Sequence, residues 1–244
     1  MCYFNSVHLA EAGIVYLNGQ ALSVPTEGQS IPLGNGFAYG EWPVVSWLNA
    51  QQGPQVQMAH WEFIPDWIKR SADLEGFRKK YNTLNAKSET VLSGKMFRQA
   101  VLHSPCLVLS SGFFEWRHVQ GEGQSKPSAY PYYIHAPTAP VFFIAGIQRE
   151  WVDLETGECI TCFALLTRPA NALMAQVHNS KKRMPLVLPQ SQAGAWLNHQ
   201  KNEDEIQSLL ETAIPEDFLT AYPVRKDFRQ WSNPEQRESY AELP

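Results

Sequence analysis

Short apolar stretches separated by Gly, Pro, Asn or Ser recur along the chain, and several alternate apolar with polar residues, as half-buried β-strands do. The pattern predicts strands at residues 14–17, 44–48, 55–60, 106–109, 113–116, 132–135, 141–146 and 160–166. Helical spacing of apolar residues predicts helices at 93–102, 170–177, 190–198 and 203–213. Because strands dominate and do not alternate regularly with helices, we expect an α+β fold. Its core should be a curved, mostly antiparallel sheet or open β-barrel-like structure with peripheral helices.

The domain organisation follows from length and from the absence of a linker-like stretch. One hydrophobic core can support 244 residues, and the chain contains no internal repeat. We expect a single domain over residues 1–244, with a loose polar tail from about residue 227 and a hairpin tip at 121–126.

Composition and charge narrow the range of partners. The chain is 44% hydrophobic and has no apolar run long enough to cross a bilayer, so we expect a globular protein without a membrane partner. The beginning of the chain does not resemble a signal peptide, which predicts a cytoplasmic location, associated with the nucleoid if the source is bacterial. The net charge of −4 argues against a surface coated in basic residues but allows a local basic groove.

The four cysteines differ in position, and only Cys2 lies at an end of the chain. Cys159 and Cys162 form a C-x-x-C pair without a second pair or a histidine partner, so we interpret them as strand or core residues. We expect no metal and no cofactor.

Methionine aminopeptidases remove the initiator methionine when the next residue is small, and cysteine is small enough. If Met1 is removed in this way, Cys2 carries a free α-amine and acquires unusual chemistry. The free α-amine would have a pKa near ~8 and the thiol a pKa near ~8.5, so both are partly nucleophilic at neutral pH. Held on adjacent carbons, they can attack one aldehyde in succession and close a thiazolidine ring. The alternative is that the cysteine at position 2 is incidental.

Three further polar residues stand in contexts that allow catalysis. Asn85 follows a strand-like segment and precedes a predicted helix, where a helix cap is the common role. Glu115 lies between aromatic residues, and if it faces inward, burial should raise its pKa toward that of a general acid. If it faces outward, it is the polar half of a strand, which is the more common case for an isolated glutamate. His178 follows a predicted helix and could exchange protons near neutral pH, although a lone histidine is more often structural or solvated.

Together these residues resemble, in order, the motifs of the SRAP family, named for SOS response-associated peptidases. The segment WEFIPDW at 61–67 is similar to W-G-x-x-P-x-W, and NAKSET at 85–90 is similar to N-A-R-x-E-T. GFFEW at 112–116 is similar to G-[FW]-[FY]-E-W, Thr167 falls in T-x-x-A, and residues 178–185 are similar to H-x-R-[MR]-P.

The resemblance implies a lyase-like activity in the DNA damage response, in which Cys2 crosslinks to a ring-opened abasic site in single-stranded DNA. It implies catalytic roles for Cys2, Asn85, Glu115 and His178. It also implies DNA contacts by the following residues: Trp67, Lys87, Thr167, Lys182 and Arg183.

Several positions depart from the family pattern. Phe4 stands where members commonly have Arg, Glu62 replaces Gly, and Lys87 replaces Arg, so some phosphate contacts must differ. Residues 179–181 lengthen the loop between His178 and the basic pair that follows it.

Two other functions fit the same residues. In a Cys-terminal peptidase or amidohydrolase, including an autoproteolytic one, Asn85 would contact an oxyanion. In a non-catalytic binder of single-stranded DNA, Cys2 would take no part. We expect no obligate protein partner.

Overall fold

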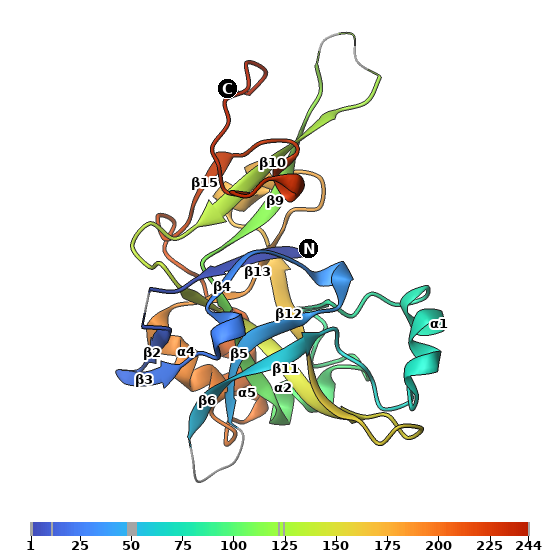
Figure 1. Ribbon diagram of the computed structural model, residues 1–244. Helices are drawn as coiled ribbons and strands as arrows, with labels where there is room; N and C mark the ends of the chain where they lie inside the picture. Colours follow the sequence, from blue (N-terminus) through green and yellow to red (C-terminus); the bar gives the residue numbers. More distant parts are fainter. Residues whose placement is uncertain (1, 11, 48–52, 122, 124, 244) are drawn as a thin grey trace.

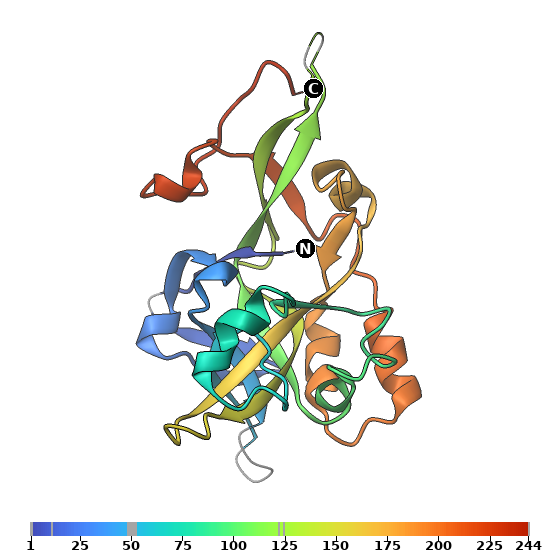
Figure 2. The same ribbon diagram turned by 90° about the vertical axis from the view of Figure 1, so that its right-hand side faces the viewer.

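Two β-sheets form most of the structure and meet near the beginning of the chain (Figures 1 and 2). The computed structural model describes residues 2–10, 12–47, 53–121, 123 and 125–243. The larger sheet contains a ring of strands: β5 (Glu41–Trp47), β6 (Pro54–Trp61), β8 (Pro105–Ser110), β11 (Phe142–Val152) and β12 (Cys159–Pro169). β11 pairs with β8 and β12, and β12 pairs in parallel with β6, so the ring is closed. The expected α+β class with a mostly antiparallel, barrel-like core is confirmed, and closure removes the free edges of an open sheet.

Short strands extend the barrel at one end of β12. β7 (Asn85–Lys87) runs parallel to β12 beside Leu165 to Thr167, and β13 (Arg183–Pro185) pairs antiparallel with its last residues. β14 (Val187–Leu188) pairs with β11. This end of β12 therefore brings together segments that are about a hundred positions apart in the sequence.

The second sheet has the order β15–β10–β9–β1–β4. Its strands are β1 (Phe4–His8), β4 (Ser30–Asn35), β9 (Gly112–Val119), β10 (Ser128–His135) and β15 (Thr220–Pro223). The predicted hairpin joins β9 and β10, and residues 122 and 124 of its tip lie outside the described residues. A separate hairpin consists of β2 (Ile14–Leu17) and β3 (Gln20–Ser23).

The Asn5 side chain ties β1 to the barrel. It donates to the carbonyl oxygen of Leu109 at 3.4 Å and accepts from Oγ of Ser110 at 2.6 Å. All three residues are buried, where each hydrogen bond also avoids the cost of an unsatisfied polar group. The first strand is thus fixed in the region where the two sheets meet.

Helices cover one side of the barrel. β8 is buried along its whole length, as its continuous apolar run requires, because α2 (Arg98–His103) and α4 (Gln190–Leu197) pack on it. Nε1 of Trp196 donates to the carbonyl oxygens of Cys106 and Gly146, at 2.9 and 3.1 Å. These bonds anchor α4 to two neighbouring strands.

The predicted helices are present with shifted ends. The remaining α-helices are α1 (Leu74–Arg78), which was not predicted, α3 (Ala172–Val177) and α5 (Glu203–Leu210). Short 3₁₀ turns occupy η1 (Thr26–Gly28), η2 (Gly36–Ala38), η3 (Ser71–Asp73) and η4 (Phe228–Gln230). The helix predicted from residue 93 begins only at Arg98, and Leu48 of a predicted strand lies outside the described residues. None of the helices in the described ranges is both long and apolar enough to cross a membrane.

The segment after Lys226 is packed, which corrects the expectation of a loose tail. Phe228 is 1% exposed and its ring stacks on Phe114 of β9, with centroids 4.7 Å apart. Nε2 of His8 lies 2.7 Å from Oε1 of Glu235, which links the segment to β1. The mostly polar composition of this segment did not reveal that Phe228 is buried against β9.

Candidate active site

The pairing of β1 with β9 brings Cys2 close to Glu115. Phe4 pairs with Phe114, and Cys2 precedes this strand by two residues. Cys2 is fully buried, and its Sγ lies 3.7 Å from the carbonyl oxygen of Phe4. Burial, and then the charge of a Glu115 carboxylate, raise the pKa of the Cys2 thiol. The two side chains therefore interact electrostatically in an environment that favours their neutral forms.

Glu115 faces the interior, which is one of the two orientations that its aromatic neighbours left open. Its side chain is buried, and burial raises its pKa to about 8. The carboxyl group therefore keeps its proton at neutral pH. A protonated carboxylic acid can donate a proton to a reacting oxygen, which an ordinary surface glutamate cannot do at this pH.

His178 lies beside Glu115, directly after α3. Its Nδ1 is 3.6 Å from Oε1 of Glu115 and 3.0 Å from the carbonyl oxygen of Arg183. Burial lowers the pKa of His178 to about 4, so the ring is neutral at neutral pH. His178 was expected to exchange protons near neutral pH, and because burial disfavours the imidazolium, its resting form here is a neutral proton acceptor.

Asn85 begins the short strand β7 and pairs with Leu165, so it is neither a loop residue nor a helix cap. It is 7% exposed, and neither Nδ2 nor Oδ1 has a hydrogen-bond partner among the described residues. A buried amide without partners is costly, and such groups in native proteins often contact ligands or bound water.

Hydrogen bonds link β7 to His178. Oγ1 of Thr167 donates to the carbonyl oxygen of Ala86, next to Asn85, at 3.3 Å. Nη2 of Arg183 donates to the carbonyl oxygen of Thr167 at 2.8 Å, and the carbonyl oxygen of Arg183 in turn binds His178. The structure therefore joins Asn85, His178 and Glu115 through consecutive contacts, with Cys2 beside Glu115.

Two of the expected DNA contacts are internal. Thr167 is fully buried, so its hydroxyl holds Ala86 and Arg183 and cannot meet DNA directly. The Arg183 side chain is only 12% exposed and forms an ion pair with Glu89, with Nη2 3.0 Å from Oε2. Glu89 was missed as a partner, although it is the acidic residue of the NAKSET segment.

Two expected cations are on the surface nearby. Lys87, next to Thr167 across the β7–β12 pairing, and Lys182, next to Arg183, are both exposed. Lys182 has a φ of 50°, in the left-handed region, and its backbone N–H donates to the carbonyl oxygen of His178 at 2.8 Å. Both lysines therefore flank the strand ends that hold Arg183.

Trp67 lines a surface groove. It is 53% exposed, and Phe63, Lys95 and Arg149 line the same groove. None of the four predicted catalytic residues lines this groove. Trp67 is exposed enough to stack on a base, and Cys2 does not line its groove.

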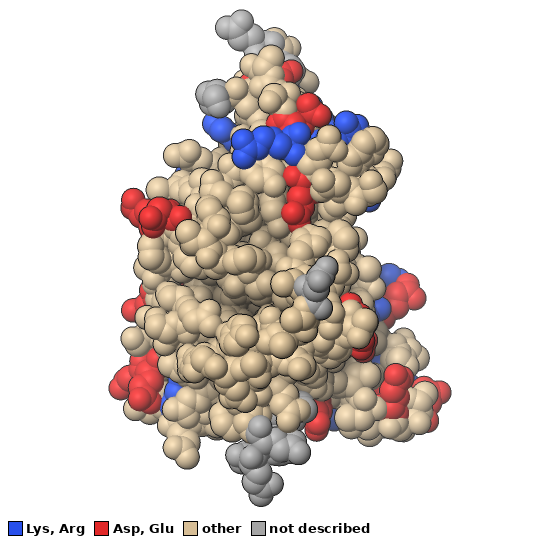
Figure 3. All heavy atoms as spheres, turned by 60° about the vertical axis from the view of Figure 1, so that its left-hand side comes forward, with Lys and Arg blue, Asp and Glu red and all other residues tan. Residues whose placement is uncertain are grey.

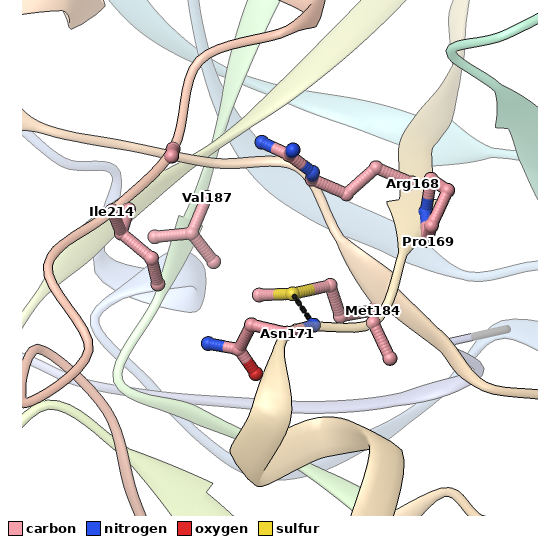
Figure 4. Close-up of a pocket in the computed structure, with 8 residues that line it drawn as sticks. Arg168, Pro169, Asn171, Met184, Val187 and Ile214 are labelled. Atoms are coloured by element: carbon pink, nitrogen blue, oxygen red, sulfur yellow. Dashed lines mark hydrogen bonds between the residues drawn. The ribbon is translucent and has the colours of Figure 1, made fainter.

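A second cavity, at the ends of β12 and β13, is also lined by none of the four predicted catalytic residues. It has a volume of about 160 Å³, and the Asn171 backbone N–H donates there to Sδ of Met184 at 3.4 Å (Figure 4). In Figure 3, Lys and Arg side chains gather at the upper end of a face that is otherwise mostly uncharged.

A further contact near Cys2 was not predicted. Tyr3 follows Cys2, and its Oη accepts a hydrogen bond from Nδ2 of Asn82 at 3.2 Å. The ring of Tyr3 also packs on that of Phe37, with centroids 4.6 Å apart. The sequence gives no sign of these contacts, because the three residues are far apart along the chain.

Proteins named as abasic site processing proteins are similar to most of the chain. It is 26% identical over 182 residues to the abasic site processing protein YoqW of Bacillus subtilis, and the match covers 74% of each chain. It is 26% identical over 190 residues to the mouse abasic site processing protein HMCES, covering 67% of this chain and 50% of the relative.

Solved structures share the fold. A crystal structure of a Bacteroides thetaiotaomicron protein superposes with a TM-score of 0.74 and 33% identity, covering 85% of each chain. A Bordetella bronchiseptica protein superposes with a TM-score of 0.70 and 20% identity, covering 92% of this chain and 100% of the other. The model of the family described as SOS response associated peptidase (SRAP) matches residues 19–231. With this match over most of its length, the chain belongs to the SRAP family.

Proposed function

We propose that this protein processes abasic sites in single-stranded DNA by bonding Cys2 to them after Met1 is removed. The observation that supports this most directly is the meeting of Cys2, a protonated Glu115 and a neutral His178 in one buried cluster. The names of the YoqW and HMCES relatives point to the same lesion. The chemistry needs a free α-amine on Cys2, which only removal of Met1 can supply.

The first step opens the sugar. An abasic deoxyribose is mostly a closed hemiacetal, and its aldehyde appears only when the bond between C1′ and the ring oxygen breaks. Glu115 donates its proton to the ring oxygen while a neutral base, His178, accepts the proton of the C1′ hydroxyl. The products are a free C1′ aldehyde and a C4′ hydroxyl, without net change in protons.

The second step forms the link. The proton that His178 accepted returns to Glu115, the Cys2 amine adds to C1′, and the aldehyde oxygen leaves as water with the two amine protons, relayed through Glu115, which gives a neutral Schiff base. The Cys2 sulfur then forms a bond to C1′, and the thiol proton ends on the former amine nitrogen. The resulting thiazolidine requires no oxidant, reductant or metal.

The remaining residues take supporting roles in this proposal. The unpartnered amide of Asn85 would hydrogen-bond the opened sugar. Lys87 and Lys182 would face phosphates, while Thr167 and Arg183 hold β7 and β13 in place. Trp67 would stack on a base in a groove that Cys2 does not line.

The test is an adduct assay on a denaturing gel. Purified protein is mixed with a uracil-containing single strand that a uracil glycosylase has treated, and a heat-stable adduct is expected. Cys2→Ser and an uncleaved amino-terminal tag should each abolish the stable adduct. Cys159→Ser, at the exposed cysteine, should leave it unchanged. Adduct formation by the tagged protein would contradict the mechanism.

The same samples separate the alternatives. Salt-dependent DNA binding that survives Cys2→Ala and leaves no covalent product would indicate a simple binder. Turnover of a peptide or amide without DNA, lost in Cys2→Ala, would indicate a Cys-terminal hydrolase.

A further inference from the structure

The residue after His178 makes an unusual pair of contacts. Oδ1 of Asn179 accepts the backbone N–H of His118 at 3.0 Å, and Nδ2 of Asn179 donates to the carbonyl oxygen of His118 at 2.7 Å. One side-chain amide thus binds both backbone groups of a single residue of β9. A neighbouring strand makes the same pair of bonds in a regular sheet.

The edge of β9 is open to such a contact at this point. β1 pairs with β9 only from Gly112 to Phe114, while β10 occupies the other edge as far as Val119. Among the strands of the described ranges, none pairs with β9 beyond Phe114 on the β1 side. The Asn179 amide therefore takes the place of a strand residue and satisfies two backbone groups that would otherwise lack a partner here.

These bonds connect the two elements that bear His178 and Glu115. His178 and Asn179 are consecutive, and Glu115 precedes His118 by three residues on β9. Other hydrogen bonds hold the end of the loop at Lys182 and Arg183. Nδ1 of His178 donates to the carbonyl oxygen of Arg183, and the backbone N–H of Lys182 donates to the carbonyl oxygen of His178. α3 packs on β9 and His178 lies beside Glu115, but among the described residues the hydrogen bonds from the loop after α3 to the β9 backbone are the two that Asn179 makes.

We propose that Asn179 is a positioning residue, which fixes His178 at its distance from Glu115 by clasping the loop after α3 to β9. Only asparagine suits this place. Aspartate keeps the acceptor but places a carboxylate oxygen against the carbonyl of His118, glutamine is longer by one methylene group, and alanine makes neither bond. The effect on reaction rate rests on the function proposed above, whereas the effect on His178 itself does not.

The rate of adduct formation tests the clasp by a double-mutant cycle. Asn179→Ala should slow adduct formation about 10- to 100-fold, since small displacements of a reacting group cost rates of this size. Affinity for an intact single strand should not change. In a His178→Ala background the same substitution should change the rate less than about twofold, because there is no imidazole left to position. Asn179→Asp should be at least as slow as Asn179→Ala.

A matched control lies in the same loop. Ser180→Ala changes an exposed neighbour and should leave the rate and the thermal stability unchanged. Equal losses for Asn179→Ala in the wild-type and His178→Ala backgrounds would overturn the positioning role, as would an Asn179→Ala variant that reacts at the wild-type rate.

A second measurement needs no DNA. NMR titration of the His178 imidazole should give a pKa near 4 in the wild type and a value closer to the ordinary 6.5 in Asn179→Ala, since the released ring is less buried. If the wild type forms no adduct, the proposed function fails, and this titration alone decides the role of Asn179. An unchanged His178 pKa in Asn179→Ala would then refute the clasp.

Discussion

Nδ1 of His178 lies 3.6 Å from Oε1 of Glu115, and the two groups have exchanged their ordinary order of acidity. The pKa of Glu115 is raised to about 8, whereas that of His178 is lowered to about 4. At neutral pH the pair is an acid and a base without charge, not an ion pair. Because a carbonyl oxygen only accepts hydrogen bonds, Nδ1 bears the proton that bonds Arg183, and Nε2 is the nitrogen that can accept one.

Replacing the acid should change the pH dependence of adduct formation. The wild-type rate should fall as pH rises above about 8, because Glu115 then loses the proton that it donates. Glu115→Gln should be slower by about 100-fold or more at neutral pH and should lack this alkaline decline. Single-turnover rates between pH 6 and pH 10 measure both effects, and a decline that persists in Glu115→Gln would assign the titration to another group.

The same substitution should stabilise the protein. The pKa of Glu115 is higher in the folded state than its ordinary value of 4.5, so its favourable contribution is complete below pH 4.5 and declines until about pH 8. Unfolding in urea at pH 8 should therefore require more denaturant for Glu115→Gln, by a free energy on the order of a few kcal/mol, while at pH 4 the two proteins should differ little. Equal differences at both pH values would show that the carboxyl charge is not the cause.

Periodicity was enough to predict the class of fold but not its closure. β8 and β12 consist largely of continuous apolar runs, so the sequence alone identifies them as buried strands. The partner of each strand depends on contacts between distant residues, and the parallel pairing of β12 with β6 has no local sign. β7 and β13 are too short to show a period, so their place beside β12 was also hidden.

The candidate site was predictable as a set of residues rather than as an arrangement. Order along the chain singled out Cys2, Glu115 and His178, but the aromatic neighbours of Glu115 left open whether it faces inward, so its raised pKa was expected only for that orientation. Whether Thr167 is exposed depends on tertiary packing, and the burial that makes it internal could not be foreseen. Asn179 belonged to an apparent loop extension, and its bonds to His118 appear only in three dimensions.

The packed segment after Lys226 should contribute to stability. Phe228→Ala removes a buried ring from its stack on Phe114 and should lower the free energy of unfolding by about 3–5 kcal/mol. Gln230→Ala, at an exposed residue of the same turn, should cost less than about 0.5 kcal/mol. Urea denaturation of both variants provides the measurement, and a Phe228→Ala protein as stable as the wild type would restore the view of a loose tail.

Two basic residues of the site should respond differently to loss of charge. Lys87 is exposed, so Lys87→Gln should reduce the slope of log affinity against log salt by about 0.7 for single-stranded DNA, as loss of one phosphate contact does. Arg183 is instead bonded to Glu89 and Thr167, so Arg183→Gln should leave that slope nearly unchanged and lower stability by about 1–3 kcal/mol. Lys126→Gln, near the tip of the β9–β10 hairpin, is the control for a general change of charge.

DNA binding of these variants measured at several salt concentrations gives the slope, and urea unfolding of the same proteins gives the stability. A slope that falls for Arg183→Gln but not for Lys87→Gln would mean that DNA displaces Glu89 and that the arginine, not the lysine, meets the phosphate.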